Sequence, residues 1–319
     1  IMGVAVADHY DCDTADEIFL GKKSLYDGDC HVSLKKAEGF DKYVQLFAVF
    51  TYPDLDDNAG YEQFLKIREN FLSECEKYGV EMIYSSADLE RFYNSDKKIG
   101  AVLTVEDSRI LDGKIERVRE LYDLGVRVMT LLWGGDTSIG GSHDTENGLT
   151  DFGKAAVEEM AKVGIIPDIS HASFKSADDI MDICEKCGVS PIATHMNSYT
   201  VCPHSRNLTD ERFMRLTKLG GVAGVSLCPP HLVAGYKRGD KAALDVIVSH
   251  FKKYEELVPS HVCFGGDMDG TSLPEGISGL DEIPKAVKLL RDAGMSERQL
   301  DEMTFDTAYE FMKKNLPSK

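Results

Sequence analysis

Residues 164–171 read Gly-Ile-Ile-Pro-Asp-Ile-Ser-His, and residues 191–195 read Pro-Ile-Ala-Thr-His. Each stretch is a short apolar run that stops at a histidine, His171 in the first and His195 in the second. Between them, residues 173–187 carry apolar side chains at helical spacing after a serine, a residue typical of helix N-termini. The pattern predicts strand, helix, strand, with a histidine just past each strand.

The rest of the chain repeats this alternation. Helices are predicted at 61–78, 114–124, 151–163, 211–219, 241–256, 280–293 and 297–314. Strands are predicted at Val4–Ala7, Val44–Phe50, Ala101–Val105, Val126–Leu132, before His171, before His195, at Val222–Leu227 and at Val262–Gly265. Eight strands alternating with helices over about 300 residues are typical of a (β/α)8 TIM-like barrel. No linker, repeat or low-complexity segment divides the 319 residues, so we expect a single domain over 1–319.

Composition excludes several classes of function. The hydrophobic fraction is 43% and the charged fraction 28%, as in soluble globular proteins. The net charge of −18 argues against nucleic acids and anionic membranes as partners. No apolar run is long enough to span a membrane, and residues 1–8 lack the features of a signal peptide. The eight cysteines form no paired framework, and we therefore expect reduced thiols and a cytoplasmic location.

Polar side chains stand at the ends of five predicted strands. They are His9, Asp11 and Asp13 after the first strand, Glu106 after the third, His171 after the fifth, His195 after the sixth and Asp267 after the eighth. The carboxyl ends of barrel strands meet at one face, which is where sites are built in this fold. Carboxylates and imidazoles that converge there are suited to a hydrolytic site with two metal ions. Each residue alone also has an ordinary structural explanation, such as a turn at Asp267 or a solvated loop at Glu106.

The sequence resembles the membrane (renal) dipeptidases and their bacterial relatives, a metallopeptidase family of the amidohydrolase type, over nearly its whole length. The motifs that carry the resemblance, in order, are Val-Glu-Asp at 105–107, Gly-Leu-Thr-Asp-Phe-Gly at 148–153, Asp-Ile-Ser-His at 168–171, Ala-Thr-His-Met-Asn at 193–197, Arg-Asn-Leu-Thr-Asp at 206–210 and Gly-Gly-Asp-Met-Asp-Gly at 265–270. The resemblance implies a TIM-like barrel with two divalent metal ions, zinc above all, and a small dipeptide as substrate. It leaves a homodimer open.

The resemblance also assigns roles to individual residues. Glu106 resembles the carboxylate that bridges the two metals, and His171 and His195 resemble the ligands of the second metal. Arg206, with Asn207 beside it, resembles the group that holds the substrate's terminal carboxylate. Asp267 resembles the acid that moves a proton between the metal-bridging hydroxide and the leaving amine. A plain alternative for Arg206 is a surface ion pair with Asp210, four residues further on.

Two positions depart from the family pattern. The family opens with His-x-Asp as ligands of the first metal. His9-x-Asp11 fits this literally, whereas an ungapped count from residue 31 places Asp11 and Asp13 there, the register we favour. At the end of the fourth strand many members have a histidine, but this chain has Trp133, which we expect to line the substrate pocket. His143, in the loop that follows, is a weaker candidate for the same site.

These departures keep other functions open. Besides a metallo-dipeptidase, the same scaffold suits an amidohydrolase with a different amide substrate, because a fold does not fix its substrate. A catalytically weakened relative that binds a small ligand is the third alternative.

Overall fold

The computed structural model describes residues 24–51 and 57–319. Its strands are β1 (Tyr43–Phe50), β2 (Glu81–Met82), β3 (Ile99–Glu106), β4 (Val126–Thr130), β5 (Ile166–Asp168), β6 (Ala223–Ser226) and β7 (Val262–Gly266). Its α-helices are α2 (Leu34–Ala37), α3 (Asp57–Tyr78), α4 (Ser86–Asn94), α5 (Glu116–Asp123), α6 (Asp151–Val163), α7 (Phe174–Cys187), α8 (Asp210–Lys218), α9 (Pro229–Leu232), α10 (Ile247–Leu257), α11 (Ile283–Asp292), α12 (Glu297–Asp301) and α13 (Thr307–Asn315).

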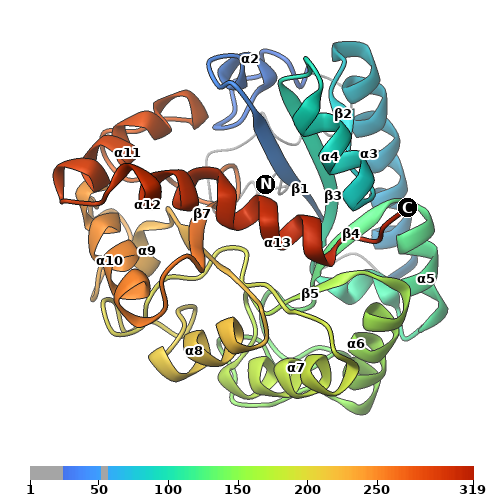
Figure 1. Cartoon of the computed structure of the whole chain (residues 1–319). Coiled ribbons are helices and arrows are strands. Elements are labelled where there is room, and N and C mark those ends of the chain that lie inside the picture. The colour runs from blue at the N-terminus through green and yellow to red at the C-terminus, as the bar shows by residue number, and fades with distance from the viewer. Residues whose placement is uncertain (1–23, 52–56) are drawn as a thin grey trace.

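The strands form one parallel series. β1, β3, β4 and β5 are neighbours in that order, with β2 beside the start of β3. β6 and β7 form a second parallel pair. Parallel bridges from Asp168 to Ile192 and from Ala193 to Ala223 join the two groups. The helices surround the strands (Figure 1), and both views place α8 beside α7, where Arg212 and Asp178 pair at 2.7 Å. The predicted α/β barrel architecture is confirmed; the strand predicted at Val4–Ala7 lies outside the described residues.

Local sequence explains where the helices around the site begin and end. The Ser173 hydroxyl accepts a hydrogen bond from the Ser176 amide at the start of α7, and Gly188 ends that helix with a left-handed φ of 71°. α6 has the same design, with Thr150 as its N-cap and Gly164 as its C-cap. The apolar side of α7 is buried in the core, through Ala177, Ile180, Met181, Ile183 and Cys184. These two helices fix the ends of the strands that carry the histidines.

α13 closes the N-terminal end of the barrel. It crosses in front of the strands in Figure 1. A buried cluster joins Phe311 and Met312 of α13, and Leu316 just after it, to residues in the strands and in the segments that lead into them: Val102, Val128, Ile166, Ile192 and Val222. This end of the strands is filled with apolar side chains, whereas the predicted site residues lie at the opposite, C-terminal end.

Several predicted boundaries were wrong. The sixth strand is reduced to bridges at 192–193, and the helix predicted from 241 begins only at Ile247, after a 3-10 turn at Leu244–Val246. The last helix is interrupted by a π-helical turn at Glu302–Asp306. β2 and α4 were not predicted, because two strand residues are too short for a pattern. The Ser85 cap of α4, which accepts from the Asp88 amide, was a signal that could have been used.

Candidate metal centre

Three buried side chains from three strand ends meet at the C-terminal side of the barrel. Glu106 is the last residue of β3, His171 follows β5, and His195 follows the bridging residue Ala193. Their ligand atoms all lie within 4.8 Å of one another. The Nε2 atom of His171 is 2.9 Å from Oε1 of Glu106, and Nε2 of His195 is 3.7 Å from the same oxygen. The structure thus brings together three of the predicted metal ligands.

The backbone around these residues is unusual. His171 has a φ of 67°, Asp107, which follows Glu106, has 73°, and Asp267 has 59°. Non-glycine residues rarely adopt this left-handed region, and where they do the surrounding structure holds them there. Turning the chain sharply at these positions brings side chains from separate strand ends to one point.

The second ring nitrogen of each histidine is already occupied. His171 Nδ1 lies 2.8 Å from the backbone carbonyl of Trp133, which can only accept, so Nδ1 carries the proton. His195 Nδ1 lies 2.7 Å from the hydroxyl of Thr194. Nε2 of His195 is buried and has no hydrogen-bond partner among the described residues. Both Nε2 atoms therefore face Glu106, while Nδ1 of each ring makes a hydrogen bond on the other side. Histidines that bind a metal commonly have this arrangement.

Burial dominates the electrostatics of the centre. It raises the pKa of Glu106 to about 7; the positive charge of Arg206 opposes this rise, and the negative charge of Asp168 adds to it. Burial, and then the positive charge of Arg206, lower the pKa values of His171 and His195 well below their usual range. The histidines are therefore neutral at pH 7, and an ionised Glu106 has no cation in direct contact among residues 24–51 and 57–319. Two neutral imidazoles and a carboxylate are a donor set that fits a divalent metal such as zinc.

Asp267 lies in the turn that follows β7. Its backbone N–H donates to the carbonyl of Gly265 at 2.7 Å, and its carbonyl accepts from Gly270. Burial raises its pKa to about 7, with a further contribution from the negative charge of Glu106. Two residues on, Asp269 accepts hydrogen bonds from the backbone N–H groups of His31 and Val32. The turn is thereby fixed to a segment more than 200 residues away in the sequence.

Arg206 is buried, with 2% of its surface exposed, and both of its terminal nitrogens lack a hydrogen-bond partner among the described residues. The plain alternative for Arg206, a surface ion pair with Asp210, is wrong, because Arg206 is buried and neither terminal nitrogen contacts Asp210, which pairs with Lys253 at 3.0 Å instead. Asp267 and Glu106 are the groups whose charges act most strongly on Arg206 to raise its pKa, against the larger effect of burial. A buried guanidinium without a partner is a site prepared for an anion.

Asn207 and Trp133 shape the surroundings of this group. The Asn207 amide nitrogen donates to the carbonyls of Cys202 and His231, both at 2.9 Å, and its buried oxygen has no partner among the described residues. The Trp133 ring lies between Phe50, 5.0 Å away, and the ring of His171, 6.2 Å away. Trp133 thus contributes its carbonyl to His171 and an apolar wall beside the centre.

Other predicted residues take different positions. His143 hydrogen-bonds to Ser205 through Nδ1 at 3.4 Å, and its ring centre is 6.0 Å from that of His171, outside the three-residue group. Burial lowers its pKa to about 4. His9, Asp11 and Asp13 lie outside the described residues, so their part in a first metal site stays a prediction.

Four further residues belong to this region and were not singled out from the sequence. Asp168 and Thr194 lie behind His195, and His204 and His231 have ring centres 4.9 Å apart beside Arg206. The backbone N–H of Arg206 donates to His204 Nδ1 at 3.1 Å. Asp168 and Thr194 lie within the motifs that end in His171 and His195. The available signal in the sequence was an acidic residue directly after the apolar run at 165–167.

Comparison with known proteins agrees with this geometry. The profile of the family described as membrane dipeptidase, peptidase family M19, matches residues 13–315. The chain belongs to the membrane dipeptidase family. Its enzyme class, a metallo-dipeptidase that hydrolyses peptide bonds, is confirmed at the level of the family, and with it the need for a divalent metal.

Individual relatives are distant. An uncharacterized protein in the pqqA 5′ region of Klebsiella pneumoniae is 29% identical over 233 residues, covering 70% of this chain and 84% of that protein. Dipeptidase aclJ of Aspergillus oryzae is 30% identical over 220 residues, covering 66% of this chain and 51% of that protein. This chain thus spans about half the length of the Aspergillus relative.

A solved structure of a metallopeptidase from Rhodobacter sphaeroides, liganded with a phosphinate mimic of the dipeptide L-Ala-D-Ala, has a TM-score of 0.84. It is 20% identical, and the alignment covers 98% of both chains. At this identity the likeness establishes the shared fold, a barrel of the TIM type.

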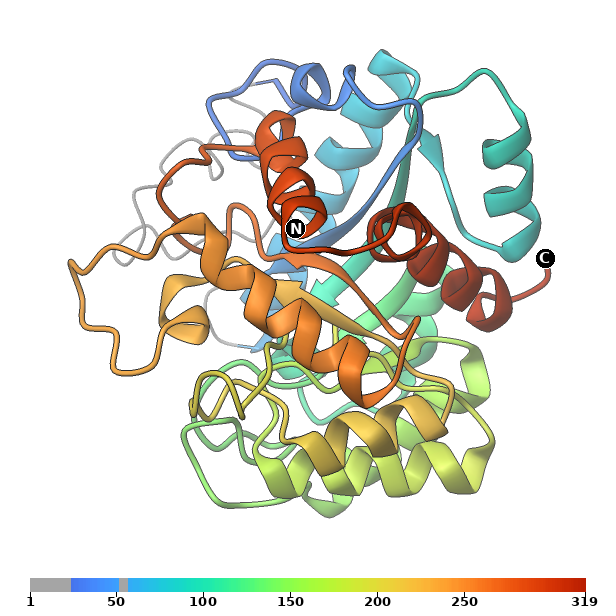
Figure 2. The ribbon, with the colours of Figure 1, turned by 60° about the vertical axis from the view of Figure 1, so that its left-hand side comes forward.

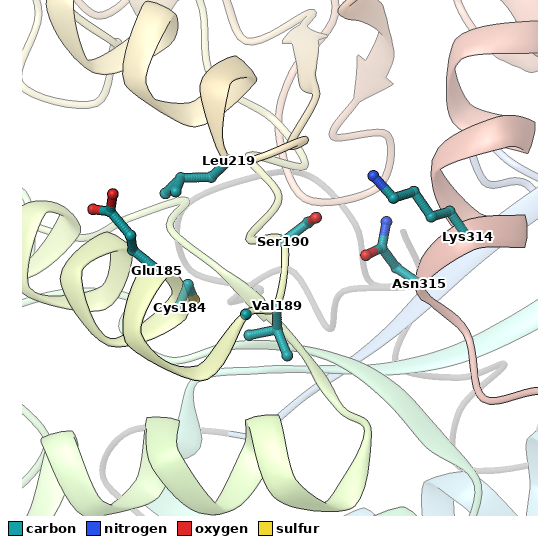
Figure 3. Close-up of a pocket in the computed structure, with 8 residues that line it drawn as sticks. Cys184, Glu185, Val189, Ser190, Leu219, Lys314 and Asn315 are labelled. Carbon is teal, nitrogen blue, oxygen red and sulfur yellow. The ribbon is translucent and has the colours of Figure 1, made fainter.

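A separate cavity of about 350 Å³ lies at the opposite end of the barrel. Lys314 and Asn315 extend from α13 toward Ser190, with Cys184 and Glu185 of α7 across from them (Figure 3). It is lined by C-terminal ends of helices, which in this fold lie away from the C-terminal strand ends. The cavity therefore takes no part in the metal centre. Among the described residues, no helix has the length and apolar character needed to cross a membrane.

Proposed function

We propose that this chain hydrolyses dipeptides with a free C-terminal carboxylate, at a centre that holds two divalent metal ions, most simply zinc. The observation that carries the proposal is that one region holds both a group of three potential metal ligands and a buried guanidinium, that of Arg206, without a partner among the described residues. One part suits activation of an amide bond, and the other suits recognition of a nearby carboxylate. The dipeptide mimic bound to the Rhodobacter protein supports a dipeptide substrate.

The proposed ligands would divide between two ions. His171 and His195 would hold one ion, Asp11 and Asp13, with His9 nearby, would hold the other, and the Glu106 carboxylate would be shared by both. When bound, the ions act as Lewis acids that lower the pKa of a water molecule and polarise the scissile carbonyl.

The chain's own residues supply the remaining steps. Arg206 binds the substrate carboxylate through two parallel N–H donors, and this contact fixes the distance from the carboxylate to the scissile bond. Asp267, with a pKa raised to about 7, accepts the proton of the attacking water and passes it to the departing amine nitrogen. Trp133 and Phe50 form an apolar wall that restricts water at the reacting carbonyl.

Paired substrates test the proposal. The specificity constant is measured for a dipeptide and for its C-terminal amide, with wild type, Arg206→Ala and the control Arg298→Ala. Arg298 carries the same group on the exposed surface of α12, where it pairs with Glu302 at 3.0 Å. We expect wild type and the control to prefer the free acid and Arg206→Ala to lose roughly ten- to a hundredfold on the acid alone, as for a charge-assisted hydrogen bond of about 1.5–3 kcal/mol.

The amide also separates the alternatives. Equal rates for acid and amide in wild type would contradict the dipeptidase proposal and favour an amidohydrolase with another substrate. Absence of turnover in metal-replete protein would favour the third alternative, in which this chain binds a small ligand without hydrolysing it.

A further inference from the structure

The hydroxyl of Thr194 lies between a carboxylate and a metal-binding histidine. Its Oγ1 is 2.5 Å from Oδ2 of Asp168 on one side and 2.7 Å from Nδ1 of His195 on the other. Asp168 is fully buried, and the described residues offer it hydrogen-bond donors at both oxygens. These donors are the N–H of Ser170 and of Thr194 at Oδ1 and the hydroxyls of Thr130 and Thr194 at Oδ2.

The directions of these hydrogen bonds follow from the chemistry of the groups. An ionised carboxylate only accepts, so the single hydroxyl proton of Thr194 points to Asp168. The lone pairs of Thr194 Oγ1 then face His195, and Nδ1 of His195 must be the donor. The ring proton is thereby held on Nδ1, and Nε2 keeps its lone pair. That atom is the one that faces Glu106 at 3.7 Å, and it has no other partner in the part of the chain that the structure describes.

We propose that Asp168 and Thr194 form a positioning relay that holds His195 in its metal-binding tautomer. The inference deepens the proposed function, since it rests on His195 being a metal ligand. His171 reaches the same tautomer through the backbone carbonyl of Trp133, which no side-chain substitution removes. For His195 the tautomer depends on a side-chain hydroxyl, and Thr194 is therefore a positioning residue whose contribution can be measured.

The backbone of this segment is held without the Thr194 side chain. Ala193 donates to the carbonyl of Val222 at 3.0 Å, and Met196 donates to that of Gly224 at 2.8 Å. The carbonyl oxygen of Thr194 fits closely against Gly224 and Gly265, at 2.1 and 2.3 Å from where a Cβ atom of each glycine would lie. A change confined to the side-chain hydroxyl therefore leaves the path of the chain intact.

Three variants isolate the relay. Thr194→Val keeps the shape and removes the hydroxyl, and Thr194→Ser restores it. Thr130→Val is the matched control, because it removes a donor to the same Asp168 oxygen, at 2.6 Å, without facing His195. Each metal-depleted protein is titrated with Zn²⁺ in competition with a chromophoric chelator. We expect Thr194→Val to bind about 10–100-fold more weakly, as for other outer-shell partners of metal-binding histidines, and the other two to stay within a few-fold of wild type.

A second measurement reads the tautomer directly. Nitrogen-15 chemical shifts of His195 in metal-depleted wild type are expected to show Nδ1 protonated and Nε2 unprotonated. In Thr194→Val the tautomeric equilibrium of His195 is expected to shift toward the Nε2-protonated ring. An Nε2-protonated ring in wild type would overturn the relay, even if Thr194→Val failed to fold. Equal zinc affinity of Thr194→Val and wild type would overturn it as well, as would an equal loss in Thr130→Val. If wild type binds no zinc, the proposed function fails, and the nitrogen shifts still decide the relay.

Discussion

His171 and Glu106 face each other across 2.9 Å with two atoms that are both acceptors when Glu106 is ionised. Nδ1 of His171 donates to Trp133, so Nε2 has no proton to offer. Two lone pairs at this distance repel unless a proton or a cation lies between them. Burial of the pair keeps solvent from screening this repulsion. Burial also raises the pKa of Glu106 to about 7, and a protonated Glu106 can donate to Nε2. A divalent cation resolves it without a proton.

Removal of either histidine is expected to lower bound metal and activity together. His171→Ala and His195→Ala each take one nitrogen ligand from a buried cluster, and metal affinity depends on the number of ligands. Elemental analysis of the purified variants measures the loss. His261→Ala serves as the control, since His261 precedes β7 at the other end of the barrel and its Nδ1 lies 2.8 Å from the Pro259 carbonyl. Unchanged metal content in both site variants would contradict the assignment.

The first metal site is testable at residues 9–13. If Asp11 and Asp13 are its ligands, Asp13→Ala is expected to remove about one equivalent of metal, while His9→Ala, acting on a neighbour of the ligands, changes metal content little. Metal stoichiometry after dialysis distinguishes the registers. The opposite pattern, with loss only in His9→Ala, would establish His9-x-Asp11 instead.

Asp267→Asn is expected to lower kcat by a factor of about 10²–10⁴ and to leave metal content unchanged, because it removes a proton carrier and preserves shape. The amide side chain has no carboxylate to accept the proton of the attacking water. Steady-state kinetics on a free-acid dipeptide, with elemental analysis of the same sample, give both quantities. Wild-type kcat in this variant would assign the proton transfer to another group.

The stability of the metal-depleted protein is expected to depend on pH through Glu106. Burial raises the pKa of this acid from 4.5 to about 7 on folding, so the folded state binds the proton more tightly than the unfolded state. Stability from this group is therefore present below pH 4.5 and is lost as pH rises through 7. Glu106→Gln carries no such proton.

Denaturant unfolding of both proteins at pH 5 and pH 8 measures this effect. As the pH rises, the free energy of unfolding of Glu106→Gln is expected to increase relative to that of wild type, by at most about 3 kcal/mol. Added zinc is expected to stabilise wild type at pH 8 and to reverse the order. A difference in stability that does not change with pH would contradict the burial of an ionisable Glu106.

The sequence predicted the parts of the molecule that depend on local patterns. The helices at 151–163 and 174–187 were located closely, because both begin with a hydroxyl cap and end at glycine. Glu106, His171 and His195 were found because each follows an apolar strand. Their meeting at one point is confirmed by the structure, whereas their roles as ligands stay predictions.

Features that depend on distant contacts were not predictable in this way. The burial of Arg206, which leaves its guanidinium without a partner among the described residues, depends on the packing of several segments, and Lys253, on another helix, pairs with Asp210 instead. The hydrogen bonds from Thr130 and Thr194 to Asp168 join three strand ends, and nothing in the local spacing of these residues indicates them. The π-helical turn at Glu302–Asp306 likewise has no periodic signal in the sequence.

The most direct test is a metal titration of catalysis. A free-acid dipeptide is mixed with metal-depleted protein, and its hydrolysis rate is followed as Zn²⁺ is added stepwise to a known protein concentration. The account predicts no turnover above background in the metal-depleted protein and a rate that rises with zinc and saturates at about two equivalents. Full turnover in the metal-depleted protein, or a rate that zinc leaves unchanged at background, would contradict it.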